Sequence, residues 1–139
     1  MKLKLSRVDV WAAEIEDKPG GLASKLLTLA NAGVNLEFVI SRRAEKEGTG
    51  VVFVSPIKGA KAVRAARAAW FDKTSSLHCL RVQGPDKSGT GARITAALAE
   101  AGINLRGLSA AAVGKQFIMY IAFDSDQDIK KSASVLKKL

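Results

Sequence analysis

The chain has little of what metal and redox centres are built from. Its 139 residues include one cysteine, Cys79, and one histidine, His78. A single cysteine cannot form an internal disulfide, which favours a reducing compartment, the cytoplasm. One cysteine beside one histidine supplies too few of the three or four ligands that a zinc site needs. We therefore expect no bound metal.

Motifs of catalysis and nucleotide binding are also missing. No Ser/His/Asp set or paired-carboxylate spacing stands out, and the twelve glycines include neither a Gly-x-Gly-x-x-Gly nor a Walker-type loop. Apolar stretches are broken within about ten residues, well short of the roughly twenty that span a bilayer, and the N-terminus lacks a secretory pattern. With 47% apolar and 25% charged residues the composition is globular. We expect no enzyme, no cofactor and no membrane segment.

An internal repeat organises the chain. A shift of 69 residues aligns 17–39 with 86–108, and ten of these 23 positions are identical. The shared positions include an Asp-Lys-x-Gly turn and an Ala-Gly-x-Asn-Leu segment further on. Such self-similarity predicts two copies of one supersecondary unit. We place the copies at 1–72 and 73–139.

Both copies show the same order of local signals. Strand patterns at 10–15 and 77–82 end at the turn, and a helical pattern follows it until Gly33 or Gly102, residues suited to a left-handed helix end. A second strand, a third strand and a second helix are then predicted at 34–41, 51–54 and 59–70 in the first copy and at 103–111, 117–123 and 126–139 in the second. This is the β-α-β-β-α order of a ferredoxin-like unit.

The predicted fold class is α+β, with two βαββαβ repeats, antiparallel sheets and helices on one face. Residues 71–76 lead from the first copy straight into the second, which ends without a fourth strand. The same shift places residues 1–7 opposite 70–76, so we expect the N-terminal strand to close the second copy by exchange. The segment 117–123 is apolar on both strand faces, although helices cover only one. This predicts intimate pairing of the copies or an oligomer, such as a homodimer.

The repeated turn is the candidate site. A glycine-rich turn that leads into a helix presents unpaired backbone N–H groups and the positive end of the helix dipole, which suit a carboxylate. Asp17 and Asp86 can accept hydrogen bonds from an ammonium group, and Asn35 and Asn104 each carry a donor and an acceptor. Such a set matches an α-amino acid. The alternative is that the aspartate caps the helix, the glycine only makes the turn and the asparagine pairs with backbone.

The two turns resemble the signature of ACT domains. The first runs Asp17-Lys18-Pro19-Gly20-Gly21-Leu22 and the second Asp86-Lys87-Ser88-Gly89, each followed by the Ala-Gly-x-Asn-Leu segment. The resemblance implies an amino-acid effector bound by the turn and the start of the second strand, at an interface between modules. It implies ligand contacts at Asp17, Lys18, Gly20, Gly21, Leu22 and Asn35, and in the second copy at Asp86, Lys87, Gly89, Thr90 and Asn104. The second copy departs from the signature at Ser88 and Gly91.

Two copies that fill the chain leave no room for a catalytic domain. A sensor of this kind would act on a partner, such as a metabolic enzyme, or through ligand-dependent oligomerisation. The competing class is an RNA-binding protein, because RNA-recognition modules share the βαββαβ order and the net charge is +9. Those modules stack bases on exposed sheet aromatics. Phe117, Tyr120 and Phe123 are candidates, but the first copy offers only Phe53, so we favour the amino-acid sensor.

Overall fold

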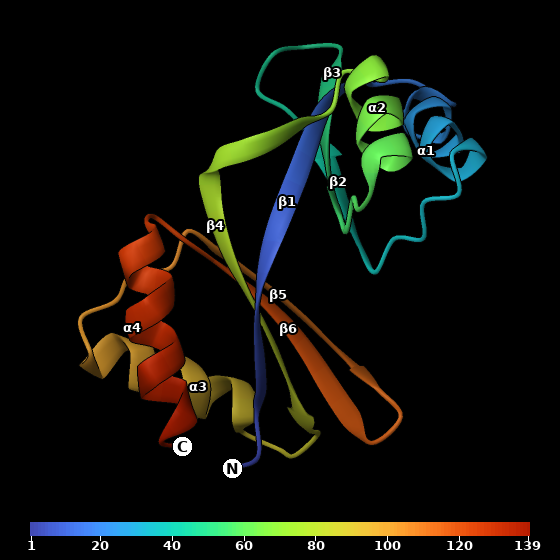
Figure 1. Cartoon of the computed structure of the whole chain (residues 1–139). Coiled ribbons are helices and arrows are strands. Elements are labelled where there is room, and N and C mark those ends of the chain that lie inside the picture. Colours follow the sequence, from blue (N-terminus) through green and yellow to red (C-terminus); the bar gives the residue numbers. More distant parts are fainter. The chain divides into compact units, whose positions relative to one another are not determined.

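The protein has an α+β fold with antiparallel strand pairing and four helices (Figure 1). The computed structural model describes the whole chain except the side chains of residues 75 and 76. The strands are β1 Lys4–Glu16, β2 Phe38–Arg43, β3 Thr49–Ser55, β4 Asp72–Pro85, β5 Gly107–Val113 and β6 Gln116–Phe123. The helices are α1 Gly21–Asn31, α2 Ala60–Ala68, α3 Thr90–Glu100 and α4 Asp126–Lys137.

The chain divides into two compact units. One is continuous in sequence and comprises residues 9–74, and the other joins residues 1–8 to residues 75–139. Below they are called the continuous unit and the joined unit. β1 and β4 are the long strands, and each contributes residues to both units.

The continuous unit is a small sheet covered by two helices. β3 pairs antiparallel with β1 and with β2, so that Val52 lies opposite both Ala13 and Ser41. The helices α1 and α2 pack together against one face of this sheet (Figure 1). The apolar sides of the helices contact every second residue of each strand, because successive strand side chains point to opposite faces of the sheet. The core is built around Trp11, Leu29, Val52, Val54 and Phe71.

The joined unit repeats this arrangement with β6 at its centre. Ile121 of β6 lies opposite Leu80 of β4 and Leu108 of β5, both in antiparallel register. α3 and α4 contact each other and pack on the core, which includes Val82, Ile94, Leu98, Ile121, Phe123 and Leu136. The side chains of Leu3 and Leu5, at the start of β1, also pack against this core.

The start of β1 is therefore held by the joined unit. In the strand order β1 is the neighbour of β4. Leu3 and the backbone of Lys2 lie close to Gly84, where a β-carbon would stand 2.8 Å from the Leu3 Cδ2 atom and 3.3 Å from the Lys2 carbonyl oxygen. The amino group of Met1 donates a hydrogen bond to the carbonyl oxygen of Leu139, and both chain ends lie together in Figure 1.

The second strand of each repeat begins later than the sequence pattern predicts. β2 starts at Phe38 rather than at residue 34, and β5 starts at Gly107 rather than at residue 103. Val34 and Leu36 alternate as strand residues do, yet they pack on the core from a loop. The loop first joins the sheet where the Glu37 N–H donates to the carbonyl of Ser55, at 2.9 Å. Alternation alone does not distinguish a loop that follows the core from a paired strand.

The aromatic residues of β6 do not form an exposed platform. Phe117 and Phe123 lie in the core, at 6% and 0% exposure, and Tyr120 is also buried. Base stacking needs an accessible aromatic face, so the side chains that made an RNA-binding module an alternative are covered. Among the described residues, no helix has the length and apolar character needed to cross a membrane.

Candidate functional site

The turn between β1 and α1 is fixed by backbone hydrogen bonds. The Asp17 N–H donates to the carbonyl of Gly48, and the Gly21 N–H donates to the carbonyl of Lys18, both at 3.0 Å. Gly20 has the left-handed conformation, with φ of 86°, immediately before the helix. A β-carbon on Gly21 would collide with the carbonyl oxygen of Glu16. The turn therefore brings the start of α1 against the end of β1, which only glycine permits.

The first turn of α1 keeps unpaired donors. No side chain caps this helix start, and the Ser24 N–H is the one that returns to the Gly20 carbonyl, at 3.0 Å. The N–H groups of Leu22 and Ala23 have no hydrogen-bond partner in the described chain. Together with the helix dipole, two such donors favour an anionic group at this end of the helix.

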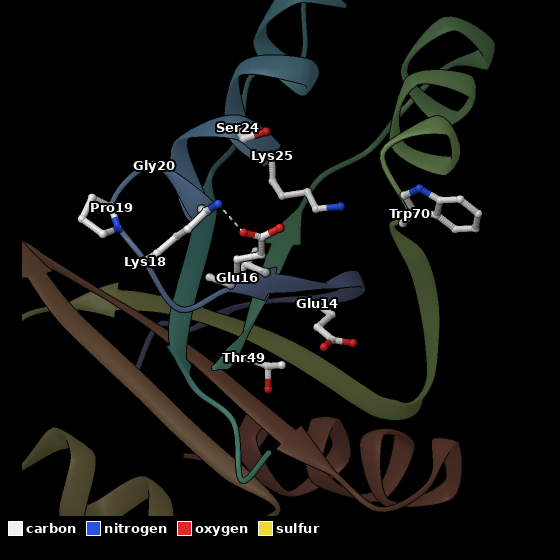
Figure 2. Close-up of a pocket in the computed structure, with 11 residues that line it drawn as sticks. Glu14, Glu16, Lys18, Pro19, Gly20, Ser24, Lys25, Thr49 and Trp70 are labelled. Atoms are coloured by element: carbon white, nitrogen blue, oxygen red, sulfur yellow. Dashed lines mark ion pairs between the residues drawn. The ribbon is translucent and has the colours of Figure 1, made fainter. Parts of the chain in front are cut away.

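A cavity of about 830 Å³ opens beside this turn, entirely within the continuous unit (Figure 2). We call it the turn cavity. Its walls come from the end of β1, the first turn of α1, the start of β3 and the second residue after the end of α2. The lining residues are Glu14, Ile15, Glu16, Lys18, Pro19, Gly20, Gly21, Ser24, Lys25, Thr49 and Trp70.

The charged side chains of the turn cavity are two acids and two bases. Lys18 Nζ lies 2.6 Å from Glu16 Oε2, an ion pair drawn as a dashed line in Figure 2. The hydrogen bond from Lys18 lowers the pKa of Glu16, so this carboxylate stays ionised. Lys25 Nζ donates to the carbonyl oxygen of Ala69 at 2.5 Å. The Glu14 carboxylate has no partner among the described residues.

The structure gathers part of the predicted ligand set at the turn cavity. Lys18, Gly20 and Gly21 line it. Asp17 does not, because its carboxylate accepts a hydrogen bond from Arg43 Nε at 2.9 Å. Leu22 packs against the core of the continuous unit.

Asn35 lies elsewhere. It lines a separate pocket of about 350 Å³ with the residues that precede and begin α2, among them Lys58, Gly59 and Lys61. In the predicted set of the first copy, three residues line the turn cavity and one lines this separate pocket, whereas Asp17 and Leu22 line neither. Asn35 follows the end of α1, which is the opposite end of the helix from the turn cavity.

The turn before α3 has the same backbone hydrogen bond and the same left-handed glycine as the turn before α1, but different side chains surround it. The Asp86 N–H donates to the carbonyl of Lys115 at 2.9 Å, and Gly89 is left-handed with φ of 83°. Thr90 replaces Gly21 at the first helical position and is buried. Its hydroxyl and its N–H both donate to the carbonyl of Lys87, at 2.8 and 3.2 Å. Asn104 is exposed after the end of α3.

Sequence reasoning missed most of the turn cavity. It did not place eight of the eleven lining residues in the site, among them Glu14, Ser24, Lys25, Thr49 and Trp70. These residues come from four separate elements and meet only when α1 and α2 pack on the sheet. One signal was present: α1 and α3 are each followed by a glycine, whereas α2 runs into Trp70 without one.

Comparisons with known proteins agree on the fold. Residues 79–139 match the family model of the ACT domain. A solved structure of a protein from Bacteroides thetaiotaomicron has a TM-score of 0.79 at 20% identity, covering 96% of this chain and 89% of the other. The ligand-free regulatory subunit of aspartate kinase from Thermus thermophilus has a TM-score of 0.68 at 16% identity, covering 98% and 95%. No curated protein sequence gives a significant match.

Identities this low establish likeness of fold and nothing finer. The family model is more specific, because it matches the sequence itself from β4 to the end of the chain. It spans the second copy of the repeat, whose Asp-Lys-x-Gly turn and Ala-Gly-x-Asn-Leu segment resemble the family signature. The part of the chain from residue 79 to residue 139 is therefore similar to an ACT domain.

Proposed function

We propose that the protein is a non-catalytic regulatory protein that binds an α-amino acid in the turn cavity. The observation that carries the proposal is that carboxylates and ammonium groups line one cavity of about 830 Å³, beside a helix start whose Leu22 and Ala23 N–H groups are unpaired. A zwitterion needs complements of both signs close together, and this cavity supplies them. The structural likeness to a regulatory subunit of aspartate kinase supports a regulatory role.

The proposed orientation follows from which groups are unengaged. The ligand carboxylate would take the two N–H groups at the start of α1, on Leu22 and Ala23. The ligand ammonium would take Glu14, whose carboxylate has no other partner, rather than Asp17, which is paired with Arg43. Lys18 stays with Glu16 and holds the turn in place.

We also propose that the chain consists of two ACT repeats, 1–72 and 73–139, with the N-terminal strand exchanged into the second. Two observations support this: the two turns have equivalent backbone hydrogen bonds, and Leu3 and Leu5 pack on the core of the joined unit. A second ligand site would then use Asp86, Lys87, Gly89, Thr90 and Asn104. The signal would pass to a metabolic enzyme in the cytoplasm or through a homodimer.

A thermal-shift screen with the twenty common amino acids tests the function. A ligand that binds only the folded protein stabilises it by about 2.7 kcal/mol at a hundred times its Kd. We expect at least one amino acid to raise the Tm, and titration calorimetry to show that Glu14→Gln weakens its binding. Glu47→Gln removes an exposed carboxylate that does not line the cavity and is the matched control.

The aspartate variants decide which turn binds. Asp17→Ala and Asp86→Ala each remove one aspartate of the repeated motif. Because Asp17 is paired with Arg43 and acts on the ligand only through the turn, its loss should weaken binding less than Glu14→Gln, and Asp86→Ala should weaken binding only if the second turn also binds. If no amino acid changes the Tm, the proposed function is wrong. Binding of RNA that weakens steeply with salt, without any amino-acid response, would favour the competing class.

A further inference from the structure

Three helices of the chain end in the same way, and one of them has an unusual residue at the critical position. After α1, the Gly33 N–H donates to the carbonyl of Ala30 and the next N–H donates to Leu29. The same pair of hydrogen bonds follows α3, where Gly102 holds the equivalent position. After α2 the position belongs to Trp70. This arrangement requires a left-handed residue, for which glycine is the usual choice.

Trp70 adopts that left-handed conformation with φ of 66°, and it is the one residue other than glycine with a positive φ in the described chain. Side chains with a β-carbon reach this region only at a conformational cost. A core contact could offset such a cost, but the Trp70 side chain has 83% exposure. The other tryptophan, Trp11, is 5% exposed within the core. The fold gains nothing visible from placing an indole at residue 70.

Trp70 is one of the lining residues of the turn cavity and lies at its edge in Figure 2. It also lines an adjoining pocket of about 360 Å³ formed with Ala12, Glu14 and Val51. Trp70 has a strained backbone, does not pack in the core and borders a cavity. Ligand binding explains a tryptophan at this position better than stability of the fold does. The apolar surface that a ligand would cover is the face of this indole.

The remaining lining indicates which side chain the ligand would carry. Two glutamates and two lysines give the cavity wall no excess charge, and the carboxylate and ammonium of an amino acid would engage charges of both signs. Beside the indole, the Lys25 ammonium is held at the Ala69 carbonyl, which disfavours a cationic ligand side chain there. For an anionic side chain, the Lys25 ammonium is already engaged by this carbonyl and the indole offers a single N–H donor beside a large apolar face, so an apolar side chain fits this wall better.

We infer that Trp70 binds the side chain of the ligand and makes the turn cavity selective for neutral amino acids with large apolar or aromatic side chains. This inference rests on the proposed function, since it assigns the specificity of the same cavity. The zwitterion would be fixed at the start of α1 and at Glu14, and its side chain would lie against the indole. The contact is apolar burial and stacking.

A ligand series on the unmodified protein is the first test. We expect leucine, phenylalanine and tryptophan to bind more tightly than alanine, aspartate or lysine, by about tenfold or more, because each buried methylene adds affinity. Calorimetry gives the Kd values. Tryptophan emission should change on binding, and a Trp11→Phe variant assigns that change to Trp70.

The decisive variant is Trp70→Gly. Glycine is the residue that the helix end prefers, so the Tm should stay unchanged or rise, while affinity for the large apolar ligands falls about tenfold or more and affinity for alanine does not. Trp70→Phe should restore most of the affinity. Leu27→Ala, which removes an apolar side chain of 59% exposure away from the cavity, should change neither quantity.

The outcomes separate the two proposals. Tight binding of an apolar amino acid that survives Trp70→Gly, or a preference for charged amino acids, overturns this inference and leaves the proposed function standing. A fall in Tm on Trp70→Gly would show that the indole serves the fold and would also overturn it. Failure of every amino acid to bind removes the proposed function itself.

Discussion

The two turns of the repeat have the same frame and different contents. In both, the aspartate N–H is bonded to a carbonyl that precedes the third strand, and a left-handed glycine starts the helix. In the continuous unit the next residue is Gly21, which lets the helix approach the end of β1. In the joined unit it is Thr90, whose hydroxyl is used within the turn. The shared backbone hydrogen bonds and left-handed glycine are features of the fold, whereas the residues around each turn decide which ligand it can bind.

The largest test of this comparison concerns the core. Leu29 and Leu98 are equivalent by the 69-residue shift and are both fully buried, at 1% and 0% exposure. We expect Leu29→Ala and Leu98→Ala to lower the free energy of unfolding by about 3 kcal/mol each, because each leaves a cavity in a packed core. Urea denaturation measures both. A loss below about 1 kcal/mol in either variant would break the equivalence of the two cores.

A smaller effect is expected at the turns, where the units differ. Gly21→Ala places a β-carbon on the Glu16 carbonyl, and we expect a loss of about 2 kcal/mol from the strain of moving backbone apart. Gly91→Ala in the joined unit is the control, because its β-carbon would meet only Met119, at 3.9 Å. That change should be neutral or stabilise by up to about 1 kcal/mol. Equal effects in thermal melts would contradict the difference between the turns.

The smallest effect distinguishes the ion pairs that hold β1 in each unit. Hydrogen bonds from His78 and then Arg7 lower the pKa of Asp126 in the joined unit. A carboxyl with a lowered pKa stabilises the fold at neutral pH, and this contribution disappears as the pH falls through that lowered value. Asp126→Asn should therefore be less stable than the parent at pH 7, with a gap that closes in acid.

Asp9 provides the matched control for this pH series. It pairs with Lys73 at 3.1 Å in the continuous unit, where no histidine takes part among the described contacts. Asp9→Asn reports the effect of losing one exposed ion pair. A stability gap for Asp126→Asn that persists unchanged to pH 2 would show that His78 and Arg7 do not act through the charge of this carboxylate.

The sequence predicted the order of elements well, because the repeat tested every pattern twice. It was wrong where alternating apolar residues have no neighbouring strand to pair with. Val34 and Leu36 alternate like strand residues but pack on the core from a loop. At the site, the motif located Lys18, Gly20 and Gly21. It could not locate Glu14 or Trp70, since their meeting depends on how α2 packs and ends. Motifs report local backbone, whereas a cavity wall is assembled from distant segments.

The division of β1 between two units affects how the chain is made. Residues 9–74 are contiguous, so the ribosome releases everything that the continuous unit requires before the second half exists. Residues 1–8 are synthesised before the continuous unit, yet their partners on the joined unit are synthesised after it. Closing a contact over so long a span is slow compared with local folding. Residues 1–8 should therefore stay without these partners until α4 has been synthesised.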